Sequence, residues 1–122
     1  MKHIIIIAAC CILFSALGMV AYSQEIQVGT FTITSTIEGY SLNNGSGERT
    51  VSVEVTFPKG FEVKPEVVLN LNSVDADKTV NTRISMKPVS ISRDGFTIQV
   101  KTWADSKINL VGGTWIAVAQ KK

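Results

Sequence analysis

The feature that most constrains the fold is an alternation of apolar and polar residues that holds from Ile26 onward. Its clearest stretch runs from Val51 to Phe57, where three valines and a phenylalanine are separated by Ser, Glu and Thr. A period of two places every second side chain on the same face of a strand, whereas a helix needs a period near 3.6. Helical spacing never persists here, so the sequence predicts an all-β fold.

Gly, Asn, Asp and Pro fall between the alternating runs and divide them into six strands. A tight turn signal at residues 93–95 favours antiparallel neighbours, and six strands suit a six-stranded antiparallel β-sandwich. Phe61 and Val63 are expected to close one end of its core. The expected strands are Ile26–Ile37, Arg49–Phe57, Glu66–Val74, Thr82–Val89, Phe96–Trp103 and Thr114–Ala119.

The N-terminal segment has the pattern of an export signal. Lys2 supplies a positive start, Ile4 to Val20 is almost unbroken apolar sequence, and small residues precede Gln24. We therefore expect a signal peptide over residues 1–23, cleaved after Ser23, and a product that is secreted, periplasmic or extracellular.

Two other fates of this segment stay open. The apolar run holds 17 residues, fewer than the ~20 of a spanning helix, which disfavours a retained membrane anchor. Cys10 follows two alanines in the manner of a bacterial lipid-attachment site, but the apolar stretch before it is short. We expect no membrane insertion of the mature chain.

The mature domain, residues 24–122, contains neither cysteine nor histidine, because His3, Cys10 and Cys11 precede it. It cannot build a Ser-His-Asp or Cys-His site or a typical zinc site, and its acids are scattered. We therefore expect one carbohydrate-binding domain with no catalytic residues, no cofactor and no metal. Asp75 and Asp77 are too few oxygen ligands for calcium, and a turn-stabilising role suits them better.

The charge balance of the mature chain argues against two common kinds of partner. Without Lys2 it has 11 basic and 10 acidic residues. Such a balance produces no strong field over the whole molecule. We expect neither nucleic acid nor an anionic membrane surface as a partner.

A tryptophan and an arginine are expected on outward faces of neighbouring strands. Arg83 alternates with the inward Ile84 and Met86, and Trp103 lies on the polar face of its strand. A sugar presents a C–H face that stacks on a Trp ring and hydroxyls that suit the donors of Arg. Packing of Trp103 under a loop or in an oligomer interface stays open. The core-facing set is Phe96, Ile98, Val100 and Thr102, and the outward set is Thr97, Gln99, Lys101 and Trp103, with Ser85 and Lys87.

Residues spread between Phe57 and Ala119 carry a resemblance to a known family. They are Phe57, Pro65 to Leu69, Asp75, Asn81 to Arg83, Gly95 and Phe96, Thr102 and Trp103, and Thr114 to Ile116. In order and spacing they resemble the H-type lectin domain family. Looser matches nearer the N-terminus extend the resemblance over nearly all of the mature chain.

The resemblance implies a sandwich that forms a homotrimer, or a higher homo-oligomer, and binds N-acetylgalactosamine-type sugars in clefts between subunits. Arg83 and Trp103 match the family's sugar-contacting Arg and Trp. Asn109 stands where the family has a contacting aromatic, and Ser46 lies nearest to an acidic contact from the neighbouring protomer. Asp105 completes the set of candidate carbohydrate-binding residues.

Ala104 departs from the family, because it replaces a contacting His directly after the Trp. The sequence thus predicts a secreted, multivalent lectin with a role in adhesion, which recognises galactose- or N-acetylgalactosamine-type or related glycans on cell surfaces or glycoconjugates. The alternative is a secreted structural or adhesion subunit that binds protein. It rests on Trp103 and on the strand Thr114–Ala119, which is apolar on both faces and contains Trp115, a core or interface candidate.

Overall fold

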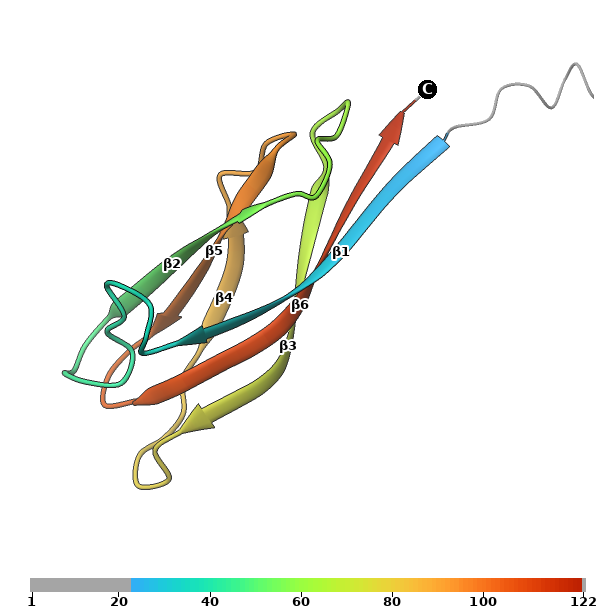
Figure 1. Cartoon of the computed structure of the whole chain (residues 1–122). Helices are drawn as coiled ribbons and strands as arrows, with labels where there is room; N and C mark the ends of the chain where they lie inside the picture. The colour runs from blue at the N-terminus through green and yellow to red at the C-terminus, as the bar shows by residue number, and fades with distance from the viewer. Residues whose placement is uncertain (1–22, 122) are drawn as a thin grey trace, which may run out of the picture.

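The computed structural model describes residues 23–121 as a sandwich of two three-stranded antiparallel sheets (Figure 1). This confirms the predicted all-β class and the count of six strands. Nearly all of the expected signal peptide, Cys10 included, lies outside the described residues. The strands are β1 (Ser23–Thr34), β2 (Arg49–Thr56), β3 (Glu66–Ala76), β4 (Ser85–Val89), β5 (Gly95–Thr102) and β6 (Ile108–Lys121).

Each sheet has its central strand late in the sequence. One sheet has the order β1-β6-β3 and the other the order β2-β5-β4. All neighbours are antiparallel, so the connections gather at the two ends of the sandwich. The loops after β1, β3 and β5 lie at one end, and the loops after β2 and β4 lie at the other (Figure 1).

The last strand begins six residues earlier than predicted, because Gly112 and Gly113 form part of it. The predicted strand began after this pair, but each glycine accommodates a neighbour. A Cβ at Gly113 would lie 2.7 Å from the Phe31 ring, and one at Gly112 would lie 2.5 Å from the Ser73 hydroxyl. The glycines therefore permit close packing on both sides of β6.

Two predicted strand ends are also wrong, for local reasons. The first strand stops at Thr34, because the Ile37 amide donates to the Thr34 carbonyl in a turn, 3.1 Å away. The fourth begins at Ser85, because the Arg83 amide donates to the side chain of Ser106 instead of to a strand. Side-chain and turn hydrogen bonds thus replace the strand pairing there.

The core lies between the sheets and follows the predicted faces. Along β5 the burial alternates residue by residue, with Phe96, Ile98 and Val100 buried and their neighbours half-exposed. Trp115 is also buried, which confirms it as a core residue. The rings of Phe57, Phe61, Phe96 and Trp115 form a cluster with centroid separations of 4.9–5.7 Å.

Phe61 closes this end of the core as predicted, but Val63 does not. Val63 is 40% exposed, whereas Phe61 is 4% exposed. Residues 57–65 form no strand, so alternation cannot be extended through them. The segment is held by the Phe61 amide, which donates to the Arg93 carbonyl at 2.8 Å.

The outer face of the β1-β6-β3 sheet is apolar and open to solvent. Val28 and Val68 flank Ile116 in register, and their exposed fractions are 65%, 61% and 40%. Ile26 lies in the next row of β1 and is also exposed. Over residues 23–121 there is no helix long and apolar enough to span a membrane.

Candidate functional site

The loop between β5 and β6, residues 103–107, is held from both sides at one end of the sandwich. On one side the amide of Gly47 donates to the Ala104 carbonyl at 2.9 Å. On the other side the amide of Asp77 donates to the Lys107 carbonyl, also at 2.9 Å. The loops after β1 and β3 therefore flank the loop between β5 and β6.

Two buried hydroxyl groups fix the backbone of Arg83. Its amide donates to Ser106 Oγ at 2.9 Å, and its carbonyl accepts a hydrogen bond from Thr102 Oγ1 at 2.6 Å. Ser106 Oγ in turn donates to the carbonyl of Asn81. Thr102 and Ser106 are both fully buried, so these bonds are shielded from water. The base of the Arg83 side chain is thereby held in one place.

The guanidinium group of Arg83 forms an ion pair with Asp105. The Nη1 to Oδ1 distance is 2.6 Å, and the side chains are 29% and 64% exposed. This hydrogen bond from Arg83 lowers the pKa of Asp105 below its ordinary value. Nη1 of Arg83 also donates to Ser106 Oγ at 3.3 Å, so this nitrogen of the guanidinium group is already occupied. Among the described residues Nε and Nη2 make no hydrogen bond, which leaves donors for a ligand.

Trp103 lies directly after β5 and keeps 39% of its surface exposed. The Lys101 ammonium lies 5.9 Å from the centroid of its ring. This confirms the predicted polar, outward face of the strand. An exposed indole beside arginine donors can hold the apolar face of a sugar ring and hydrogen-bond its hydroxyls.

Arg49 was not among the predicted site residues, yet it joins two of these loops. Its Nε donates to the Gly47 carbonyl at 3.0 Å, and Nη1 donates to the Asn44 carbonyl at 2.7 Å. Its Nη2 donates to the Ala104 carbonyl at 2.9 Å. The planar fork of arginine suits three carbonyls in fixed positions, which lysine cannot match.

Ala104 adopts a left-handed backbone conformation, with φ of 56°. For a residue other than glycine this conformation costs roughly 1–2 kcal/mol. The two hydrogen bonds that its carbonyl accepts, from Gly47 and Arg49, hold it there. The turn reverses the chain between Trp103 and Asp105, so that Asp105 reaches Arg83.

Of the five predicted site residues, the structure joins Arg83 and Asp105 by an ion pair and places Trp103 two residues before Asp105 in the same loop. Ser46 is exposed in the loop that Arg49 ties to Ala104, so it lies at the same end. Asn109 is exposed near the start of β6. Within residues 23–121 no hydrogen bond joins Ser46 or Asn109 to the other three.

Three positioning residues were missed by the sequence reasoning. Thr102 gave one signal, since it is a polar residue at a core-facing position of an otherwise apolar set. Ser106 gave none, because its partners lie 23 to 25 residues away in the chain. Arg49 gave none, because its partners are backbone carbonyls, two of them 2 and 5 residues away and the third 55 residues away. Such pairs leave no local periodicity to detect.

Asp77 supports its own turn, as expected of a turn-stabilising residue. Its Oδ1 accepts hydrogen bonds from the Thr79 amide at 2.8 Å and from the Thr79 hydroxyl at 2.6 Å. These bonds lower the pKa of Asp77. Within residues 23–121 no three His, Cys, Asp or Glu side chains gather as metal ligands.

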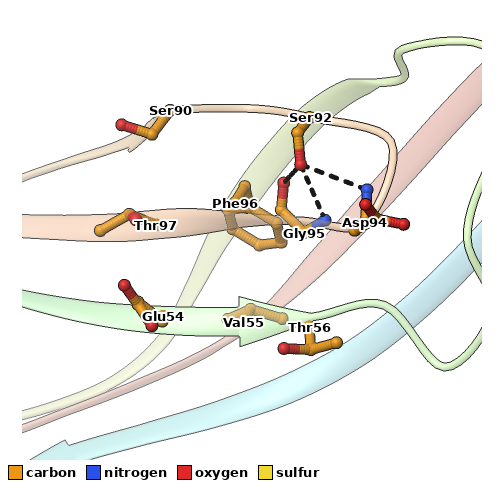
Figure 2. Close-up of a pocket in the computed structure, with 9 residues that line it drawn as sticks. All are labelled: Glu54, Val55, Thr56, Ser90, Ser92, Asp94, Gly95, Phe96 and Thr97. Carbon is orange, nitrogen blue, oxygen red and sulfur yellow. Dashed lines mark hydrogen bonds between the residues drawn. The ribbon is translucent and has the colours of Figure 1, made fainter.

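A shallow cavity of about 300 Å³ lies at the opposite end, beside the turn between β4 and β5. Figure 2 shows that Ser92, one of its lining residues, hydrogen-bonds to the backbone of that turn. Ser92 Oγ accepts from the amides of Asp94 and Gly95 at 3.2 and 3.3 Å and donates to the Gly95 carbonyl at 3.2 Å. The cavity has no exposed aromatic ring, and we assign it no ligand.

The family model of the H-type lectin domain matches residues 52–118. The chain belongs to the H-type lectin family. The matched segment contains Arg83, Trp103 and Asp105 together with their positioning residues Thr102 and Ser106. Membership makes this H-type lectin a carbohydrate-binding protein and not an enzyme.

Relatives at the level of sequence and structure agree with this assignment. A discoidin-1 polypeptide of Dictyostelium discoideum is 34% identical over 80% of this chain, which spans 40% of that protein. A protein of Fuscovulum blasticum called ATP synthase subunits region ORF 7 is 35% identical over 66% of this chain and 70% of its own. The structure of discoidin II from D. discoideum superposes with a TM-score of 0.72 at 29% identity, over 82% of this lectin and 38% of that chain. The lectin therefore spans about two fifths of its discoidin relatives.

Proposed function

We propose that this H-type lectin is exported and multivalent, and that it binds galactose- or N-acetylgalactosamine-type or related glycans in adhesion to glycan-coated surfaces. The observation that carries the proposal is that the exposed Trp103 directly follows Thr102, whose buried hydroxyl holds the Arg83 carbonyl, while Ser106 holds the Arg83 amide. In this proposal Trp103 is the stacking platform and Arg83 donates to sugar hydroxyls. Asp105 holds the guanidinium in place and accepts from a hydroxyl with its free oxygen.

Association of subunits through the outer face of the β1-β6-β3 sheet is the second part of the proposal. Val28, Ile116 and Val68 form a row of exposed apolar side chains across all three strands. Exposed apolar area of this kind favours contact with another protein surface. A homotrimer, or a higher homo-oligomer, covers this face and leaves the β2-β5-β4 sheet outward.

In such an assembly the binding cleft lies between neighbouring subunits. Ser46 is carried on an exposed loop at the site end, and Asn109 is exposed near the start of β6. Both are available to contact a sugar held by Trp103 of the same or the adjacent protomer. Several weak sites on one assembly then hold a multivalent surface more tightly than one site does.

Export rests on the N-terminal sequence pattern, with cleavage after Ser23. The mature product would begin at Gln24, two residues before the first exposed apolar residue of β1. N-terminal sequencing of the purified protein tests this directly. A product that retains Met1 and fractionates with membranes would support the anchor instead.

A glycan-array screen of residues 24–122, with Trp103→Ala and Arg83→Ala beside it, tests the lectin function. Because both side chains are partly exposed, we expect each variant to fold while its affinity falls at least about tenfold, or 1.4 kcal/mol. Arg93→Ala, which removes an arginine at the opposite end, should bind like the parent protein.

The rival function, a structural or adhesion subunit that binds protein, is favoured by the same apolar face. Under this function the protein would bind no glycan, and Trp103 would support the oligomer and not a sugar. Binding to no glycan would favour it, as would loss of the oligomer in Trp103→Ala measured by analytical ultracentrifugation. Loss of glycan binding in a variant that keeps its oligomeric state would contradict it.

A further inference from the structure

Two lysines lie on the outer face of the β2-β5-β4 sheet beside Trp103. Lys101 and Trp103 are two residues apart and share this face, about 7 Å apart along the strand. In β4, Ser85 pairs with Lys101 and Lys87 pairs with Gln99. Lys87 is therefore the diagonal neighbour of Lys101 on the same face. The order of side chains leading away from the site is Trp103, Lys101 and Lys87.

Neither ammonium group is neutralised by the residues around it. Among the described residues Lys87 and Lys101 take part in no ion pair, and the contact of Lys101 is with the Trp103 ring. Asp105, the acid of the site, is already paired with Arg83. The acids closest to this face are Glu48, which directly precedes β2 and continues its register opposite Trp103, and Glu54, which lies opposite Thr97, two rows beyond Lys101. Within residues 23–121 neither acid forms an ion pair with the two lysines.

The rest of this face consists of groups that hydrogen-bond sugars well. Gln99 lies between Ser52 and Lys87, and Lys101 lies between Thr50 and Ser85. None of these neighbours carries a negative charge. The face therefore combines neutral hydroxyl and amide groups with two unpaired positive charges next to an aromatic ring.

We propose that the sugar site of this lectin continues along β5 onto Lys101 and Lys87, and that the continuation binds a carboxylate or sulfate carried by the sugar stacked on Trp103 or by the sugar next to it. The proposal rests on the proposed lectin function and adds the chemical class of the glycan. Ser46, the loop residue expected to approach the sugar, is neutral and does not repel an anion. Lys101 and Lys87 lie on the sheet that the proposed association through the β1-β6-β3 sheet leaves uncovered.

The test compares lactose with two derivatives that carry an added anionic group. Lactose, 3′-sulfated lactose and 3′-sialylated lactose are titrated into the purified protein by calorimetry. We expect the two anionic forms to bind more tightly than lactose. Each lysine should raise the affinity for them about two- to fivefold, which is the range of an exposed ion pair. The gain should shrink in 1 M salt, where the Debye length falls to about 3 Å. The difference between the two anionic probes shows which anion fits.

The variants Lys87→Gln and Lys101→Gln separate this subsite from the rest of the site. Each should reduce the affinity for the anionic probes and leave the affinity for lactose within about twofold. Lys87→Arg should keep the higher affinity for the anionic probes. Arg93→Gln removes a positive charge at the far end of the same sheet. It should change neither the affinity for the anionic probes nor the affinity for lactose. Equal binding of charged and neutral probes, or a loss in Arg93→Gln equal to that in Lys87→Gln, would overturn the subsite alone. A protein that binds no probe, or binds them all without Trp103, would overturn the lectin function as well.

Discussion

The two ends of the sandwich are built on different principles. At one end four aromatic rings, those of Phe57, Phe61, Phe96 and Trp115, pack against one another in the core. Dispersion and the removal of apolar surface from water hold this end together, and neither depends strongly on direction. Small changes in the position of a ring are therefore tolerated there.

At the other end the loops are held by directed hydrogen bonds to backbone atoms. Arg49 donates to three carbonyls, and Ser106 and Thr102 bond the main chain at Arg83. Such bonds contribute modestly to stability, but an unpaired buried group is costly. This end consequently fixes the orientation of side chains, which is what recognition of a sugar requires.

The comparison implies that stability and binding can be changed separately. Removing a ring should lower the free energy of unfolding and leave the site intact in the folded molecules. Removing a hydrogen bond at the site end should cost less stability and more affinity.

Phe57→Ala should have the largest effect on stability. Phe57 is 4% exposed and contacts the three other rings of the cluster. Truncation leaves a cavity, so we expect a loss of about 3–5 kcal/mol in the free energy of unfolding, measured by urea denaturation at fixed protein concentration. Phe57→Leu should lose clearly less. If the folded fraction of Phe57→Ala also loses sugar affinity, the two ends are not independent.

Ser106→Ala should have the second-largest effect on stability, and it should also lower glycan affinity. It leaves the Arg83 amide and the Asn81 carbonyl without their buried partner, at a cost of about 1–3 kcal/mol. Freed from Ser106, Arg83 is less well placed, so glycan affinity should also fall. Ser92→Ala is the matched control, because Ser92 Oγ bonds three backbone atoms in an exposed turn at the opposite end. Similar losses of affinity in the two serine variants would contradict a positioning role for Ser106.

The same comparison explains what the sequence could predict. Alternation identified the buried set of β5, because every second residue of that strand faces the core. It did not distinguish the two faces of the last strand, which are both apolar and one of which buries Trp115. It failed for Val63, which lies outside any strand, and for the start of β6, where Gly112 and Gly113 permit close packing.

The site was predicted less completely than the core. The resemblance to the family pointed to Arg83 and Trp103, and the structure adds the contact between Arg83 and Asp105. Arg49 and Ser106 bond to backbone atoms, some of them far away in the chain, and any residue can supply a backbone carbonyl or amide. Side-chain types therefore carry no information about such pairs, and only the fold reveals them.

Arg49→Lys should have a smaller effect than Ser106→Ala on stability. It keeps the charge but loses the fork that joins the carbonyls of Asn44, Gly47 and Ala104. Because the bonds are exposed, we expect a loss of about 1 kcal/mol in the free energy of unfolding. Release of the Ala104 turn should lower glycan affinity severalfold. Arg93→Lys, in the turn at the other end, should change neither quantity.

The smallest expected effect is that of pH on binding near neutrality. Residues 24–122 contain no histidine, so their affinity should be flat between about pH 6 and 8. The hydrogen bond from Arg83 lowers the pKa of Asp105. A lowered pKa means that the contribution of this pair is complete above the ordinary value of about 3.9 and is lost as the pH falls through the lowered value. Affinity measured from pH 8 down to 3 should therefore fall only below about pH 4.

Ala104→His sharpens this test, because it places an imidazole in the turn between Trp103 and Asp105. Histidine tolerates the left-handed conformation at this position better than most residues. Its ring titrates near pH 6.5, so the variant should acquire a slope in the window where the parent protein has none. A steep change between pH 6 and 8 in the parent would instead show that a carboxylate with a raised pKa takes part. That result would contradict the pairing of Asp105 with Arg83 as the arrangement that binds sugar, since this pairing holds the pKa down.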